Sequence, residues 1–191
     1  MRVFGIDPGS ACTGYGCVDS DGRRHRLVVC GAIRGEPGAF PDRLASIYRE
    51  LSGILRECQP QCVAIENLFH ATNVRSALKL GHARGVAMLA AVQAGLPIVE
   101  YSPAEVKRAV VGYGRAEKPQ VQQMIKLLLG LERAPQPHDA ADALAVAICH
   151  LHLCPREPAA RQRSMDAPGR ASPSPKSWRQ YQPKASRTSL T

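Results

Sequence analysis

The chain has 191 residues, 45% of them hydrophobic, and a formal net charge of +9. This length supports one folded domain with a core, and its seven cysteines include no C-x-x-C pair, which argues against a small secreted disulfide scaffold. No uncharged apolar run reaches the ~18 residues of a membrane helix and no leader precedes the first strand, so we expect a cytoplasmic protein without a membrane segment.

An antiparallel meander followed by alternating helices and strands is predicted for the first 154 residues. Apolar patterns and turn residues predict the first three strands, at residues 2–7, 12–20 and 25–34. A helix and a strand follow, at 42–58 and 61–67, and this crossover favours parallel pairing. The remaining predicted elements are a helix at 73–95, a strand at 96–101, and helices at 102–111, 117–130 and 139–153. Together they predict an α/β fold with a five-stranded mixed sheet flanked by helices.

Residues 155–191 differ in composition from the rest of the chain. They carry eight Lys and Arg residues against two acids, a net charge of +6, which leaves +3 of the total for residues 1–154. They are rich in Pro and Ser and have too little apolar content to bury a core. We therefore expect a domain at 1–154 and a disordered basic tail at 155–191; an accessory segment that binds nucleic acid or a partner is the alternative for the tail.

Two strongly apolar strands end on carboxylates. Asp7 closes the strand RVFGID, and Glu66 closes the apolar run CVAIE. Asp7 also precedes a Pro-Gly turn, so capping of that turn is the alternative role for it. Because ligands gather beyond the carboxyl ends of parallel strands, neighbouring strands would bring the two acids together.

A second pair of acids, Asp139 and Asp142, lies three residues apart in HDAADAL, a spacing that puts both on one helical face. Complementing the helix dipole is the alternative role for them. Asp142, however, lies a full turn inside the helix and has no obvious buried Lys or Arg partner. The adjacent His138 is a candidate metal ligand or proton carrier, or only a neighbour of the N-cap.

Four acids at one point would repel one another unless a cation lay among them. Hard oxygen ligands select Mg²⁺ or Mn²⁺. Two such ions about 4 Å apart are able to activate water and stabilise the leaving oxygen in phosphodiester hydrolysis. We therefore expect Mg²⁺, replaceable by Mn²⁺, with two ions in the site.

Five separated motifs resemble those of one family. In order within residues 3–152 they are GIDPGSACTGYG, AIENLF, SALKLGHARGVAMLAAV, VKRAVVGYGRAEKPQVQQMI and DAADALAVAICH. Together they are similar to the bacterial RuvC Holliday junction resolvases of the ribonuclease H-like superfamily. The resemblance implies a ribonuclease H-like fold and a homodimer that nicks two opposed strands of a four-way DNA junction symmetrically. It also implies that the RuvA-RuvB branch-migration complex is a partner.

The resemblance assigns the catalytic and metal-binding roles to acids already singled out. They are Asp7, Glu66, Asp139 and Asp142. The family has His or Asp at its third acidic position, so His138 is the alternative to Asp139. The three-residue spacing to Asp142 favours Asp139.

The resemblance also implies contacts with DNA. Phe69, shortly after Glu66, would wedge against bases at the junction centre, where stacking contributes roughly 1–3 kcal/mol; packing under its own loop is the alternative. Lys107 and Lys118 match basic residues near the scissile phosphate, although both would also suit a solvated helix face. Arg75 and Lys79 are further candidates for the DNA groove.

Gly81 and Gly85 lie one turn apart in a predicted helix, where each Gly costs about 1 kcal/mol relative to Ala. Close packing of another backbone would compensate for this cost. The resemblance places the helix at the dimer interface, and packing on the sheet of the same chain is the alternative.

The segment CHLHLC invites a zinc assignment that its spacing does not support. On one helix only residues three or four apart share a face, as His150 and Cys154 do, and no second pair completes a tetrahedral set. We therefore expect a core cysteine and surface histidines there.

Two functions besides junction resolution remain open from the sequence. One is a ribonuclease H-like nuclease that acts on structured RNA. The other is a junction-binding protein without catalysis, against which the presence of all four acids argues.

Overall fold

The computed structural model describes residues 1–35, 38–67 and 73–154. The strands are β1 (Arg2–Asp7), β2 (Cys12–Ser20), β3 (His25–Arg34), β4 (Cys62–Glu66) and β5 (Ile98–Tyr101). The helices are α1 (Phe40–Cys58), α2 (Val74–Gln93), α3 (Pro103–Val111), α4 (Lys118–Leu128) and α5 (His138–Leu153). Every strand and helix expected from the sequence is present among these residues, and none of the described helices is long and apolar enough to cross a membrane. The tail expected at 155–191 lies outside the described residues.

The strands form one five-stranded mixed sheet in the order β3-β2-β1-β4-β5. β1, β2 and β3 pair antiparallel as a meander, whereas β1 with β4 and β4 with β5 pair parallel. The predicted fold class is therefore confirmed. Parallel pairing places the carboxyl ends of β1 and β4 at the same edge of the sheet, and the register sets Ile6 opposite Ile65. The residues that follow this pair are Asp7 and Glu66.

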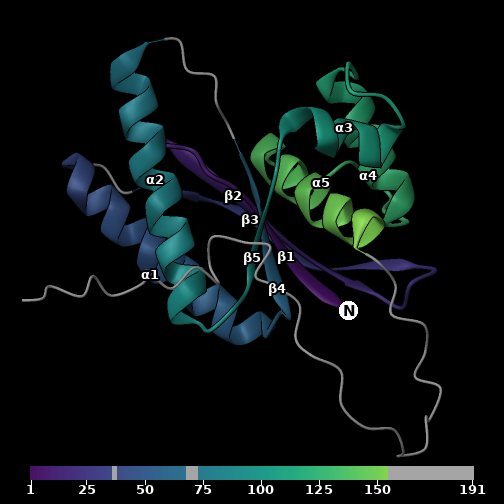
Figure 1. Ribbon diagram of the computed structural model, residues 1–191, viewed down its shortest axis with the longest axis horizontal. Coiled ribbons are helices and arrows are strands. Elements are labelled where there is room, and N and C mark those ends of the chain that lie inside the picture. Colours follow the sequence, from purple (N-terminus) through teal and green to yellow (C-terminus); the bar gives the residue numbers. More distant parts are fainter. Residues whose placement is uncertain (36–37, 68–72, 155–191) are drawn as a thin grey trace, which may run out of the picture. The chain divides into compact units, whose positions relative to one another are not determined.

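Helices cover both faces of the sheet. Figure 1 shows α1 and α2 on one side and α3, α4 and α5 on the other. Because successive strand side chains face opposite ways, each face has its own buried cluster. Phe4 and Ile6 of β1 lie in the cluster with α1 and α2, and Val3 lies in the cluster with α3, α4 and α5.

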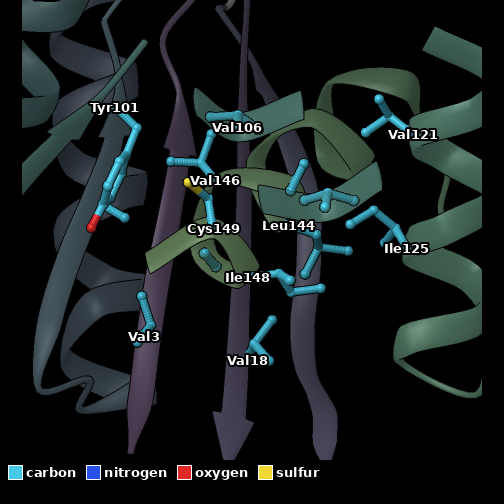
Figure 2. Close-up of a cluster of buried hydrophobic side chains, with 14 of the residues drawn as sticks. Val3, Val18, Tyr101, Val106, Val121, Ile125, Leu144, Val146, Ile148 and Cys149 are labelled. Atoms are coloured by element: carbon cyan, nitrogen blue, oxygen red, sulfur yellow. The ribbon is translucent and has the colours of Figure 1, made fainter. Parts of the chain in front are cut away.

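α5 is buried along most of its length. Within residues 140–150, every residue is buried except Asp142. The expectation of a surface histidine is therefore wrong for His150, whose Nδ1 lies 2.8 Å from the hydroxyl of Tyr101. Figure 2 shows Leu144 and Ile148 of α5 beside Val18 of the sheet and Ile125 of α4. Alanine fills many of the other positions, so the helix is narrow enough to lie close to the strands.

Glycines in β1 and β2 permit this close approach. A Cβ added at Gly5 would lie 2.0 Å from the carbonyl oxygen of Ala143, and one at Gly14 would lie 2.0 Å from that of Asp139. No side chain fits in such a space, so only glycine allows the helix backbone to reach the sheet. The contact brings the first turn of α5, with Asp139 and Asp142, to the edge where Asp7 lies.

Gly81 and Gly85 of α2 differ from these strand glycines. Apart from the backbone of α2 itself, the structure describes no neighbouring atom within 4 Å of a Cβ at either position. Among the described residues, the two glycines therefore contact no other element. The helix itself does pack on the sheet of the same chain, because Ala87, Ala90 and Ala91 lie in the buried cluster with residues of β1 and β4. They line an open pocket of about 450 Å³ beside α1.

We expect Gly5→Ala to lower the free energy of unfolding by about 1–3 kcal/mol or more, because its methyl group would overlap the α5 backbone, which has no rotamer to change. Urea denaturation measures this change. The matched control is Gly53→Ala in α1, where the structure describes no neighbouring atom within 4 Å of the added Cβ and helix propensity predicts a gain of up to about 1 kcal/mol. Wild-type stability of Gly5→Ala would contradict the contact.

Candidate active site

Asp7 and Glu66 lie side by side at the ends of two parallel strands. They line one pocket of about 290 Å³, together with Asp142 of α5. The side chains of Asp7 and Glu66 are close enough for a hydrogen bond between them to influence the pKa of Glu66. The structure thus brings together, from three separate elements, three of the four acids that the sequence singles out.

Asp139 lies one turn before Asp142, at the same end of α5. It does not line the 290 Å³ pocket, but its negative charge contributes to the raised pKa of Asp7. Its carboxylate also faces Cys12, whose thiol pKa is raised to about 11 by burial and by the hydrogen bond and charge of Asp139. The sequence gives no signal for this role of Cys12, because a lone cysteine after a turn has no distinguishing spacing.

Burial and mutual repulsion perturb the carboxyl groups. Burial, followed by the charges of Glu66, Asp142 and Asp139, raises the pKa of Asp7 to about 8. Burial and Asp142 raise the pKa of Glu66, while its hydrogen bond with Asp7 and the charges of Lys118 and Lys107 act in the opposite direction. The site is therefore short of positive charge, and an additional cation would relieve the repulsion.

Two lysines face the acids from the neighbouring helices. Lys118, the first residue of α4, places Nζ 3.0 Å from Oδ2 of Asp142, although its own side chain is 73% exposed. Asp142 thus has a cationic partner, although the sequence offers no obvious buried Lys or Arg for it. Lys107 of α3 lines the same pocket. Both lysines expected near the reacting phosphate are thus found beside the acids.

The other candidate residues lie elsewhere. His138 is exposed, and its Nδ1 accepts a hydrogen bond from Nε2 of Gln122, 2.6 Å away. Arg75 and Lys79 lie on α2, where Nζ of Lys79 is 5.8 Å from the ring centroid of Phe40. Phe69 lies outside the described residues.

The donor set suits a hard divalent cation. Every acidic group at the pocket offers oxygen alone, the ligand type that Mg²⁺ and Mn²⁺ prefer, and the ammonium of Lys118 already balances part of the charge. Among the described residues, no three His, Cys, Asp or Glu side chains stand close enough to form a complete metal centre. Binding would therefore require these side chains to close around the ion.

We expect Asp7→Asn to stabilise the protein in the absence of divalent metal at alkaline pH. An acid whose folded-state pKa exceeds its unfolded value adds stability below the unfolded pKa, and this contribution is lost as the pH rises through the folded pKa of about 8. Asparagine keeps the shape without the charge. In EDTA, the gain in unfolding free energy should be absent below the ordinary Asp value of 3.8, grow as the pH rises, and level off on the order of 1–2 kcal/mol above pH 8.

Chemical denaturation across this pH range measures the effect. Asp19→Asn is the control, because Asp19 lies on the same sheet but in an exposed ion pair with Arg2. It should show no gain that grows with pH. A less stable Asp7→Asn at alkaline pH would contradict the repulsive site.

Comparison with known proteins identifies the family. The sequence model described as crossover junction endodeoxyribonuclease RuvC matches residues 3–150. The RuvC of Pelotomaculum thermopropionicum is 53% identical over 153 residues, 80% of this chain and 93% of the relative, and that of Syntrophotalea carbinolica is 57% identical over 153 residues, 80% and 94%. The structure of T. thermophilus RuvC in complex with Holliday junction substrate matches with a TM-score of 0.76 at 36% identity, over 80% of this chain and 93% of that one. The chain therefore belongs to the RuvC family of crossover junction endodeoxyribonucleases and has its ribonuclease H-like fold.

Proposed function

We propose that this protein resolves four-way DNA junctions by paired symmetric nicks, using divalent metal ions to hydrolyse a phosphodiester bond. The observation that carries the proposal is the pocket in which Asp7, Glu66 and Asp142 meet Lys107 and Lys118. A carboxylate cluster with adjacent cations suits phosphoryl chemistry, and the chain belongs to a family of junction endonucleases. The solved relative bound to Holliday junction substrate supports the same class of substrate here. Because the substrate is DNA in a bacterial family, we place the activity in the cytoplasm.

Four acids would hold Mg²⁺ or Mn²⁺ in a two-ion site: Asp7, Glu66, Asp142 and, beside them, Asp139. When bound, the ions supply an activated water and stabilise the charge that develops on the phosphate during in-line displacement. Asp7 and Glu66 would hold the cation as carboxylates, so ion binding would compete with protonation of the pair. Val106 and Val121 form an apolar wall that keeps the carboxylates partly shielded from water, which strengthens their attraction for cations.

The basic residues orient the DNA. Lys107 and Lys118 hold the scissile phosphate at the mouth of the pocket, since both already face its carboxylates. Arg75 and Lys79 of α2 contact the backbone away from the cut, and Phe69 stacks on a base at the junction centre. Backbone contacts of this kind position the strand without reading its sequence.

A homodimer would supply the two cuts. α2 exposes apolar residues to solvent, with 77% of Val74, 59% of Leu78 and 49% of Leu89 accessible. Together with the open pocket at Gly81 and Gly85, this face suits the close approach of a second helix. We propose that two copies pair through α2, that residues 1–154 suffice for nicking, and that the dimer works beside the RuvA-RuvB branch-migration complex.

Cleavage of labelled substrates tests the catalytic proposal. With Mg²⁺, we expect paired nicks at symmetric positions of a mobile four-way junction, and much slower cleavage of linear duplex or structured RNA. Asp7→Asn and Glu66→Gln should bind the junction but cut roughly 100-fold to 1,000-fold more slowly, because each removes a charge that the cations require. Asp19→Asn is the control that should cut normally.

The outcomes separate the alternatives. Unchanged cleavage by Asp7→Asn would refute the assignment of the acids. Faster cutting of structured RNA would favour an RNA nuclease, and junction binding without any metal-dependent nick would favour a non-catalytic protein. Lys118→Ala should lose at least about tenfold in rate, whereas Lys126→Ala, on the same helix but outside the pocket, should lose little.

The α2 dimer makes a separate prediction. Leu78→Glu combined with Leu89→Glu should convert the protein to a monomer, because four charges would be buried across a two-fold interface. Sedimentation equilibrium measures the change, and the two nicks on one junction should become uncoupled. Leu127→Glu is the matched control, since Leu127 is 63% exposed on α4. A double variant that remains dimeric would contradict this interface.

A further inference from the structure

Two histidines from distant parts of the chain face each other at the opposite end of α5 from the acids. His25 begins β3 and His152 lies in the last turn of α5. Their Nε2 atoms are 3.1 Å apart, and their ring centroids are 5.1 Å apart. Both rings line a pocket of about 810 Å³. The resolvase proposal does not use this pair.

Hydrogen bonds to the other ring nitrogens define the protonation of each histidine. Nδ1 of His152 lies 2.9 Å from the carbonyl oxygen of Ala109, which only accepts, so Nδ1 carries the proton and Nε2 has a lone pair. His25 must then donate its Nε2–H to His152. Its Nδ1, 3.0 Å from Oγ of Ser20, accepts the hydroxyl proton. Each ring is thus held through Nδ1, and its Nε2 faces the other ring.

We infer that His25 and His152 form a binding site for a transition-metal ion such as Zn²⁺. Two nitrogen ligands at ~2.0–2.1 Å from a tetrahedral ion are separated by about 3.3 Å, close to the 3.1 Å found here. Metal-binding histidines usually have their second nitrogen held by a carbonyl or another polar group, as Ala109 and Ser20 hold these two. Water completes the coordination.

Binding requires one tautomer change and no net loss of a proton from the pair. His25 transfers its proton from Nε2 to Nδ1, which then donates to Oγ of Ser20. That oxygen also accepts from the N–H of Gly22, 3.1 Å away, and a hydroxyl oxygen has two lone pairs for the two bonds. Both Nε2 lone pairs then point to the ion.

The site differs in selectivity from the carboxylate pocket. Within the described part of the chain its lining contains no Asp or Glu, and neutral imidazole favours Zn²⁺, Ni²⁺ or Cu²⁺ over Mg²⁺. Arg23 and Arg24 line the same pocket, so we expect micromolar rather than nanomolar affinity. Because the ion would link the β2–β3 turn to the end of α5, it should stabilise the fold.

Calorimetric titration of the full chain with ZnCl₂, in excess MgCl₂ that saturates the carboxylates, tests the inference. We expect one ion per chain. His152→Asn and His25→Asn each keep an atom at the Nδ1 position but remove Nε2, and should weaken binding by at least roughly tenfold. His82→Asn is the matched control, since Nδ1 of His82 likewise lies 2.6 Å from a helix carbonyl, that of Leu78, at a separate place.

Imidazole ¹⁵N NMR of the wild type gives a second measurement that needs no variant. Zn²⁺ should shift the Nε2 resonances of His25 and His152, and EDTA should reverse the shift. Thermal unfolding in Zn²⁺ should raise the Tm of wild type and His82→Asn by a few degrees, but not that of the other two variants. No zinc binding by wild type, or full binding by His25→Asn and His152→Asn, would overturn the inference.

Discussion

The contact between the α5 backbone and the glycines of β1 and β2 is the constraint on which the rest of the structure depends. Because Gly5 and Gly14 have no side chain, the helix reaches the strands and its first turn arrives beside Asp7. Burial desolvates the acids, and this desolvation together with their mutual repulsion raises the pKa of Asp7. The same contact that forms the core thus creates a site that a divalent cation stabilises.

Much of the fold and the acidic site could be predicted because the evidence for them is local. Period-two and helical patterns identify elements one at a time, and the capping of α3, where Ser102 and Glu105 bond reciprocally, is likewise a local feature. A carboxylate at the end of an apolar strand is unusual and so suggests a functional role. Parallel pairing of two such strands brings both carboxylates to the same edge of the sheet. Asp142 was identified in the same way, since it interrupts an otherwise buried helix.

The features that could not be predicted depend on pairs of residues from separate elements. Lys118 reaches Asp142 from a different helix, and its exposed position gave no reason to expect an acidic partner. Spacing within CHLHLC excluded a metal site on one helix, but the residue that meets His152 is His25, from a strand distant in sequence. Nor does the sequence around Gly81 and Gly85 distinguish packing within the chain from an open face.

A pH titration of Asp7 without divalent metal tests the central claim most directly. ¹³C NMR follows the chemical shift of its side-chain carboxyl carbon. The account predicts that this group titrates far above its ordinary value of 3.8, at about 8, and that Mg²⁺ lowers the midpoint because the cation competes with the proton. A titration midpoint near the ordinary value of 3.8, unchanged by Mg²⁺, would contradict the account.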